Sequence, residues 1–248
     1  MKDVFLTAPE GKISLSKPSK MPGYSWSLAA GITCPAAKMT IKEWGDKAIC
    51  SGCYAKGGFY RMGNVQDAQS RRLRWVLRSI RENDGAEAVN GLVSLIKATG
   101  QDLFRVHDSG DLFSEEYIRI WIEVAGQCPE VRFWIPTREW IRPEQHTALA
   151  ELAGLPNVTL RPSAMAIGHE APNPGLSSLT VGLSAGTTVT VEPLEGHYTC
   201  PSTVKGKPSK CAENDCTMCW NPTVPVAYMV HSAPKLEAAG RKSLPVLS

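Results

Sequence analysis

Three cysteines lie within twenty residues of one another in the N-terminal part of the chain, and two of them have CxxC spacing. Cys34 is followed by a polar stretch that leads to Cys50, Ser51, Gly52 and Cys53. The two small residues permit a tight turn, so both flanking sulfurs can converge on one metal ion or one cluster edge. We therefore predict a metal-thiolate site, in which the fourth ligand is remote or one coordination position stays open.

Thiolates select zinc or iron–sulfur clusters over hard cations. An iron–sulfur cluster, most simply [4Fe-4S], is the interpretation that we favour for the first group of cysteines. Zinc, a redox-active CxxC pair and unligated cysteines are the alternatives that the spacing leaves open.

A second group of four cysteines lies near the C-terminus, again with a CxxC pair. The surrounding segment is rich in turn-forming residues and poor in apolar ones, so it cannot build a core of its own, and metal ligation would hold it together. Four thiolates suffice for tetrahedral zinc or for a fully ligated cluster, and we expect a closed structural site. The two groups could also converge on one centre. The four residues are Cys200, Cys211, Cys216 and Cys219.

The length of 248 residues fits one domain with a substantial core. A net charge of +3 is too small to argue for a nucleic-acid partner, and no apolar run approaches membrane-spanning length. The first residues do not form a signal peptide, so we expect a cytoplasmic protein with reduced thiols rather than disulfides. Cys128, alone at a predicted helix end, is interpreted as a structural thiol.

Strands and helices alternate through the middle of the chain. This pattern predicts parallel pairing and an α/β fold, as a partial or complete (β/α) barrel. We expect a single domain, with a loop-rich, cysteine-containing N-terminal arm (1–63), a β/α core (64–195) and a cysteine-rich metal-binding segment with a tail (196–248). The predicted strands are 103–107, 131–135, 158–161, 179–182, 188–192 and 225–231; the predicted helices begin near 64, 86, 114 and 143.

The first predicted helix has an apolar stripe at Leu73, Val76, Leu77 and Ile80. Asn64 is a good residue to cap its N-terminus. The arginines between positions 71 and 81 lie on the other faces. They are typical of a solvated helix face, with phosphate binding as the alternative.

Polar loops follow three of the predicted strands. In a β/α barrel the chemistry lies at the C-terminal ends of the strands, which points to residues 107–111, 137–138 and 161–163. The candidate catalytic residues are His107, Asp108, Asp111 and Arg138. The alternative is structural: the aspartates would cap the turn and the helix, and the histidine would bond at a strand end.

The chain resembles the phage gene product 88-like family. The resemblance spans most of the chain and brings no established activity; if the chain is phage-encoded, it would act in the host cytoplasm. It is carried by Lys20–Gly23, Cys50-x-x-Cys-Tyr-Ala55, Phe104–Asp111, Val131–Trp134 and the last cysteines up to Trp220.

The order of features also resembles the core of a radical S-adenosylmethionine enzyme. In that family three cysteines, the last with an aromatic neighbour, hold a [4Fe-4S] cluster with one open iron, and a glycine turn contacts the amino group of the cofactor. The resemblance implies that Cys34, Cys50 and Cys53 are the triad, and that Ser109, Gly110 and Asp111 are the cofactor turn. Two departures stand out: fifteen residues separate the first two cysteines, where the family has three, and an aspartate replaces a glutamate.

Three functions compete at this point. The first is an iron–sulfur protein, which in its finer form would be a redox or radical enzyme with S-adenosylmethionine, acting on an unknown small molecule or with a redox partner. The second is a zinc protein that binds nucleic acid through residues 71–81 and the lysines of 205–210. The third is a structural protein in which the metals serve folding alone.

Overall fold

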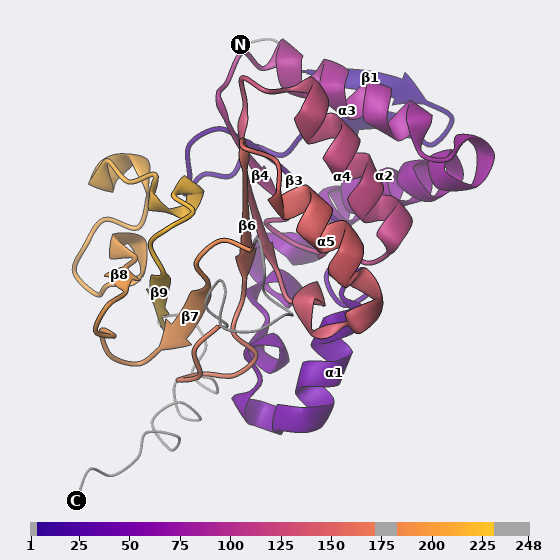
Figure 1. Ribbon diagram of the computed structural model, residues 1–248. Coiled ribbons are helices and arrows are strands. Elements are labelled where there is room, and N and C mark those ends of the chain that lie inside the picture. The colour runs from indigo at the N-terminus through magenta and orange to yellow at the C-terminus, as the bar shows by residue number, and fades with distance from the viewer. Residues whose placement is uncertain (1–3, 172–182, 231–248) are drawn as a thin grey trace, which may run out of the picture.

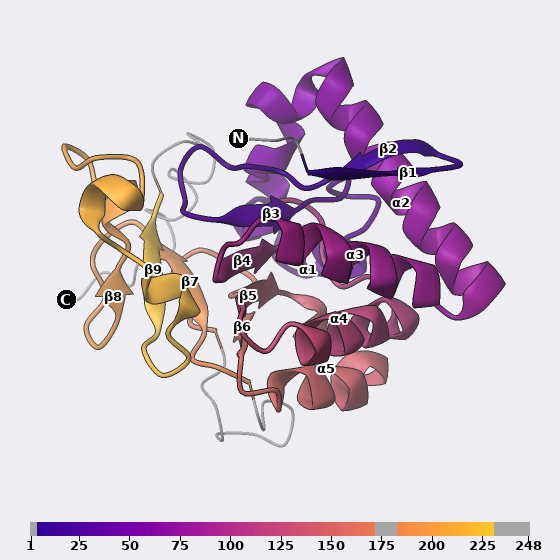
Figure 2. The same cartoon turned by 90° about the horizontal axis from the view of Figure 1, so that it is seen from above.

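The computed structural model describes residues 4–171 and 183–230. These residues form three layers (Figure 1). A four-stranded parallel sheet lies in the middle, and helices cover one of its faces. The cysteine-rich C-terminal segment lies against the other face, as the view from above also shows (Figure 2).

The central sheet has the strand order β3-β4-β5-β6, and every neighbouring pair is parallel. This confirms the predicted parallel pairing, and the strands predicted at 103–107, 131–135 and 158–161 are all present. Phe104 stands beside Phe133, which in turn stands beside Val158. The strands are β3 (Tyr24–Trp26), β4 (Leu103–Val106), β5 (Arg132–Thr137) and β6 (Val158–Pro162).

Four helices cover the sheet face that carries Phe104 and Phe133, and the buried tryptophans Trp75 and Trp121 pack there. The predicted start of the third helix is confirmed, because the Ser114 hydroxyl accepts a hydrogen bond from the Tyr117 amide. None of the helices in the described residues is long and apolar enough to cross a membrane. The four are α2 (Gly63–Asn83), α3 (Ala86–Ala98), α4 (Glu115–Gln127) and α5 (His146–Ala153).

The burial of α2 differs from the prediction. The helix begins at Gly63, so Asn64 does not cap it, and Leu77 is 44% exposed. Arg72, expected on a solvated face, is buried instead. Its Nε donates to the Ser14 carbonyl at 2.8 Å, and its Nη1 donates to the Ser27 carbonyl at 3.1 Å. A buried guanidinium is tolerated because these neighbouring segments supply its acceptors, which helical periodicity alone cannot show.

The first residues are more ordered than the predicted loop-rich arm. Strands β1 (Phe5–Ala8) and β2 (Gly11–Ser14) form an antiparallel hairpin, and β3 is an edge strand of the central sheet. These strands are three or four residues long, too short for a convincing alternating pattern. β1 and β2 are defined by pairing with each other, and β3 is defined by its partner β4, far along the chain.

A second parallel sheet, in the order β7-β9-β8, belongs to the C-terminal layer. Two of its strands confirm the predictions at 188–192 and 225–231, whereas 179–182 lies outside the described residues. The layer packs on the central sheet through Met21, Leu103, Trp134 and Trp220. The strands are β7 (Thr187–Thr190), β8 (Tyr198–Thr199) and β9 (Val226–Met229).

Arg161 of β6 holds this layer in place. Within the described residues, every hydrogen bond of its buried guanidinium goes to a backbone carbonyl. These acceptors belong to Ala185, Met218, Cys219, Asn221 and Val224.

The predicted barrel is confirmed only as far as its parallel β/α organisation, because the described residues form no closed barrel. An isolated bridge joins Ser163, just after β6, to Thr187 of β7, and at the opposite edge β3 pairs only with β4 among the named strands of the described residues. The sheet face that would line a barrel is covered by Trp220 and the cysteine-rich segment. The fold is therefore an open α/β arrangement with parallel sheets.

Candidate metal-thiolate site

The segment that carries the first cysteines crosses the C-terminal ends of the central strands. We call residues 27–62 the cysteine arm. At its start the Leu28 amide donates to the Ser109 carbonyl at 2.9 Å. Further on, the Ile49 amide donates to the Met165 carbonyl at 3.0 Å, just beyond β6. The arm therefore lies at the edge where parallel α/β sheets place their ligand sites.

Cys34 immediately precedes helix α1 (Pro35–Trp44), whose first position is a proline, as is common at helix starts. Burial raises the pKa of its thiol to about 12, and the negative charge of Asp111 adds to this. The charges of Cys53 and Cys50 raise the same pKa further. All three arm thiols therefore lie close enough to influence one another, next to the loop that follows β4.

Cys50 lies in a 3₁₀ turn, Ile49–Gly52, and Cys53 follows it directly. Burial raises the pKa of Cys53, whereas the positive charges of Lys56 and Arg138 act in the opposite direction. Arg138 comes from the end of β5, and its Nε donates to the Ala164 carbonyl at 3.0 Å. The predicted site residue Arg138 is thus brought to the arm thiols and is held in a fixed orientation.

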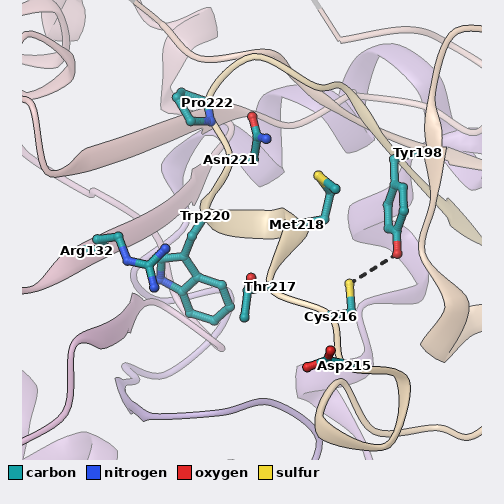
Figure 3. Close-up of a pocket in the computed structure, with 9 residues that line it drawn as sticks. All are labelled: Arg132, Tyr198, Asp215, Cys216, Thr217, Met218, Trp220, Asn221 and Pro222. Atoms are coloured by element: carbon teal, nitrogen blue, oxygen red, sulfur yellow. Dashed lines mark hydrogen bonds between the residues drawn. The ribbon is translucent and has the colours of Figure 1, made fainter.

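The second group of thiols lies in the C-terminal layer, and its sulfurs contact hydroxyl groups. The Tyr198 hydroxyl donates to Cys216 Sγ over 3.4 Å (Figure 3). Cys219 Sγ lies 3.1 Å from the Tyr228 hydroxyl. A cavity of about 420 Å³ opens beside Cys216.

Burial raises the pKa of Cys219 to about 12, and the charge of Cys200 adds to this. Burial also raises the pKa values of Cys200 and Cys211, each of which is raised further by the charge of Cys216. The four thiols thus influence one another electrostatically, as the three arm thiols do. Two separate gatherings of thiols are present, on different elements of the fold.

All eight cysteines are free thiols. In the part of the chain that the structure describes, no group of three or more His, Cys, Asp or Glu side chains could hold a metal ion as it stands. The donors for a thiolate site are therefore gathered but not drawn together to coordination distance.

Asp111 is buried and accepts three hydrogen bonds. Its Oδ1 accepts hydrogen bonds from the Thr137 hydroxyl at 2.6 Å and from the Leu112 amide at 2.8 Å, and its Oδ2 accepts from the Arg138 amide at 3.0 Å. Burial raises the pKa of its carboxyl group in spite of these bonds. Asp111 therefore ties the loop after β4 to the end of β5, which agrees with the structural reading of this residue.

Glu139 is a second buried carboxyl group at this edge. Its Oε1 accepts from the Ala36 amide at 3.1 Å, and its Oε2 accepts from Arg142 Nη1 at 2.8 Å. Burial and then the charge of Asp111 raise its pKa to about 7, against the effect of Arg142. The carboxylate at the start of α1 positions the helix that follows Cys34.

Ser109 and Gly110 contact the arm. The Ser109 hydroxyl donates to the Leu28 carbonyl at 2.6 Å. Gly110 has a φ of +89°, and a Cβ there would lie 2.7 Å from the Thr33 hydroxyl. The glycine turn therefore permits close packing of the arm, and its predicted role in binding a cofactor stays a prediction.

His107 and Asp108 complete the loop. His107 is buried, its Nε2 lies 2.9 Å from the Tyr117 hydroxyl, and burial followed by the charge of Arg105 lowers its pKa to about 3. Asp108 accepts hydrogen bonds from the Ser25 hydroxyl at 2.9 Å and from the Tyr60 hydroxyl at 2.8 Å. His107 is thus a neutral packing residue, and Asp108 fastens the arm.

The model of the family described as Gene product 88 matches residues 6–222. The chain belongs to the Gene product 88 family. The Gene 88 protein of Mycobacterium phage L5 is 30% identical over 117 residues, which is 44% of this chain and 44% of that protein. The chain thus matches less than half the length of this curated relative.

No solved structure matches the chain. The region that the Gene product 88 model matches contains both cysteine groups and the loop after β4. The family is therefore defined over the same part of the chain that carries the candidate site.

Sequence reasoning noted Tyr54 only as the aromatic neighbour of Cys53 and missed other residues of the site. Tyr54 donates its hydroxyl hydrogen to the Asp108 carbonyl, and Arg105 Nη2 lies within 3.4 Å of the same hydroxyl. The position of Tyr54, directly after Cys53, was a usable signal. Tyr60, Glu139 and Arg105 carry no local signal, since only the fold brings them to the arm.

Proposed function

We propose that the protein binds metal through thiolates, and that Cys34, Cys50 and Cys53 hold an iron–sulfur cluster. The observation that carries the proposal is the gathering of three free thiols at the C-terminal edge of a parallel sheet, where the charges of Cys50 and Cys53 raise the pKa of Cys34 and the charge of Cys50 raises that of Cys53. Thiols that repel one another as anions are stabilised by a shared cation, and thiolates favour iron–sulfur clusters or zinc. Three protein thiolates would leave one iron of a [4Fe-4S] cluster for another ligand.

The donors must move together for this site to form, and the architecture of the arm supports such a movement. Beyond α1 the arm consists of short 3₁₀ turns, which have fewer stabilising hydrogen bonds than a packed helix. Glu139 fixes the start of α1, and Arg138 and Lys56 supply positive charge near Cys53. A bound cluster would accept and donate single electrons in this setting.

The colour of the protein tests the proposal. Anaerobically purified protein should be brown, absorb near ~400 nm, and contain iron and acid-labile sulfide, because thiolate-to-iron charge transfer occurs there and zinc is d¹⁰. A colourless protein without iron and sulfide after anaerobic reconstitution would contradict it.

A finer form of the proposal is a radical or redox enzyme that uses S-adenosylmethionine. Its support is the position of the arm beside the loop 107–111. Asp111 already accepts three hydrogen bonds, so an ammonium group would have to use its remaining acceptor capacity. Millimolar S-adenosylmethionine should change the electron paramagnetic resonance signal of the reduced cluster. If neither the spectrum nor calorimetry responds, the role of S-adenosylmethionine should be abandoned, and an iron–sulfur protein without it would remain.

Zinc binding with a structural or nucleic-acid role is the second candidate, and the four thiols of the C-terminal layer would suffice for tetrahedral zinc as well as for a fully ligated cluster. The arginines of α2 support nucleic-acid binding less than expected. Arg72 is buried, and Arg78 pairs with Glu10 at 2.8 Å and Glu87 at 2.6 Å. Metal analysis decides between zinc and iron, and salt-dependent oligonucleotide binding would test the nucleic-acid role.

A further inference from the structure

The cysteine arm carries a concentration of exposed apolar side chains. Seven large hydrophobic residues of the described chain are markedly exposed, and five of them lie between positions 32 and 62. Phe59 is 81% exposed and Ile32 is 73% exposed. All five belong to one segment, the cysteine arm, whereas apolar residues that are scattered singly over a surface need no explanation. The five are Ile32, Met39, Tyr54, Phe59 and Met62, and we call residues 32–62 the arm surface.

The same stretch is positively charged. Five exposed cations are opposed only by Glu43 and Asp46, so the arm surface has a formal charge of +3. Within the described residues, none of the five takes part in an ion pair; the ion pairs there join other residues. These charges are therefore free to attract an anionic partner. The cations are Lys38, Lys42, Lys47, Lys56 and Arg61.

We propose that the arm surface docks a small acidic electron-carrier protein. The charge of the surface calls for an acidic partner, and its exposed apolar residues supply the apolar contacts that a protein interface needs. The assignment as an electron carrier rests on the proposed cluster, because Cys34, Cys50 and Cys53 lie within the same stretch. In the step that docking serves, one electron leaves the reduced carrier and enters the cluster, and no bond or proton changes place.

The composition of the surface favours a protein over a single-stranded nucleic acid. Nucleic-acid surfaces use free aromatic rings on which bases stack. Here Tyr54 is bonded to the Asp108 carbonyl and packs edge-on against Tyr60, with ring centroids 5.8 Å apart. Among the five exposed residues, only Phe59 has an aromatic ring that makes no such contact in the described residues. Ile32, Met39 and Met62 have no aromatic ring. Exposed methionine beside aromatic residues is typical of protein interfaces.

Titration calorimetry with an acidic [2Fe-2S] ferredoxin tests the proposal. We expect binding at ~20 mM salt that weakens at ~300 mM, where the Debye length falls well below 10 Å. Phe59→Asp and Arg61→Glu should each weaken binding about tenfold or more. The matched control is Leu77→Asp, which introduces the same charge at an exposed apolar residue of α2 outside the arm surface and should leave binding unchanged.

Three results would overturn the proposal: no binding at low salt, equal binding by Phe59→Asp and the unaltered protein, or salt-dependent binding of a single-stranded oligonucleotide instead of the ferredoxin. Iron and sulfide are measured on the same samples. Iron without ferredoxin binding leaves the proposed function standing and removes the docking surface. Binding to a chain that takes up no iron removes the electron-transfer role together with the proposed function.

Discussion

The two cysteine groups use the same side chain in different surroundings. The arm thiols lie on short turns at the sheet edge, near the charges of Asp111, Arg138 and Lys56. The thiols of the C-terminal layer lie among hydroxyl groups, and the layer is held by Arg161 and Trp220. The first setting is built of short turns at the sheet edge, whereas the second resembles a structural clamp, although a cavity opens beside Cys216. We infer that one group serves chemistry and the other serves folding.

Replacement of Cys216 by Ser should have the largest effect if this comparison is right. The segment around it has little core, so ligation energy would be folding energy, and we expect a loss on the order of several kcal/mol in the free energy of unfolding. Urea unfolding and metal analysis provide the measurement. Cys128→Ala is the control, since that buried thiol belongs to the hydrophobic core and should not affect metal content. A Cys216→Ser protein with full stability and full metal content would refute the structural clamp.

Replacement of Cys53 by Ala should strip metal from the arm site and leave the other site loaded. Because ligation also stabilises the arm, stability should fall by several kcal/mol, but by less than in Cys216→Ser. Iron content and urea unfolding of both variants sharpen the comparison. Unchanged metal content in Cys53→Ala would remove Cys53 from the ligands.

A smaller effect concerns pH and His107. Burial, followed by the charge of Arg105, lowers its pKa from 6.5 to about 3 in the folded protein. The unfolded chain therefore binds a proton between these values that the folded chain does not. The contribution of the neutral His107 ring to the free energy of unfolding is fully present above pH 6.5. It is lost as the pH falls below this value, by up to about 1.4 kcal/mol per pH unit.

The variant His107→Gln should lose this contribution to the slope, measured as the free energy of unfolding at several values between pH 4 and 7. His197→Gln, a histidine of the C-terminal layer whose ring contacts the Glu195 carbonyl, is the matched control. An identical slope in His107→Gln and the unaltered protein would mean that the ring is not held neutral.

The β/α core could be predicted because its signals are local. Ser114 caps α4, and the strands before and after this helix are short and apolar. This local strand–helix–strand pattern is enough to predict the parallel pairing of β4 with β5. Barrel closure could not be predicted in this way. Whether a sheet closes depends on what covers its other face, and here Trp220 reaches the Phe104 carbonyl across 116 positions of sequence.

The residues of the candidate site likewise divide into those with a local signal in the sequence and those that only distant segments bring together. Cysteine spacing pointed to both groups of thiols, and Arg138 was found because it follows a strand. The hydrogen bonds of Asp111 could not be derived from local pattern, because two of its donors, Thr137 and Arg138, come from the end of another strand, and its role in ligand binding stays a prediction. Glu139 was missed because its partner, the Ala36 amide, lies 103 positions away.

The central claim is that two separate thiolate centres form on one chain. Native mass spectrometry of anaerobically reconstituted protein measures it most directly, with Cys53→Ala and Cys216→Ser analysed alongside. The account predicts two mass increments on the unaltered chain, of which one, an iron–sulfur cluster, disappears in Cys53→Ala while the other persists. A chain that carries no metal, or one increment that both substitutions remove, would contradict it.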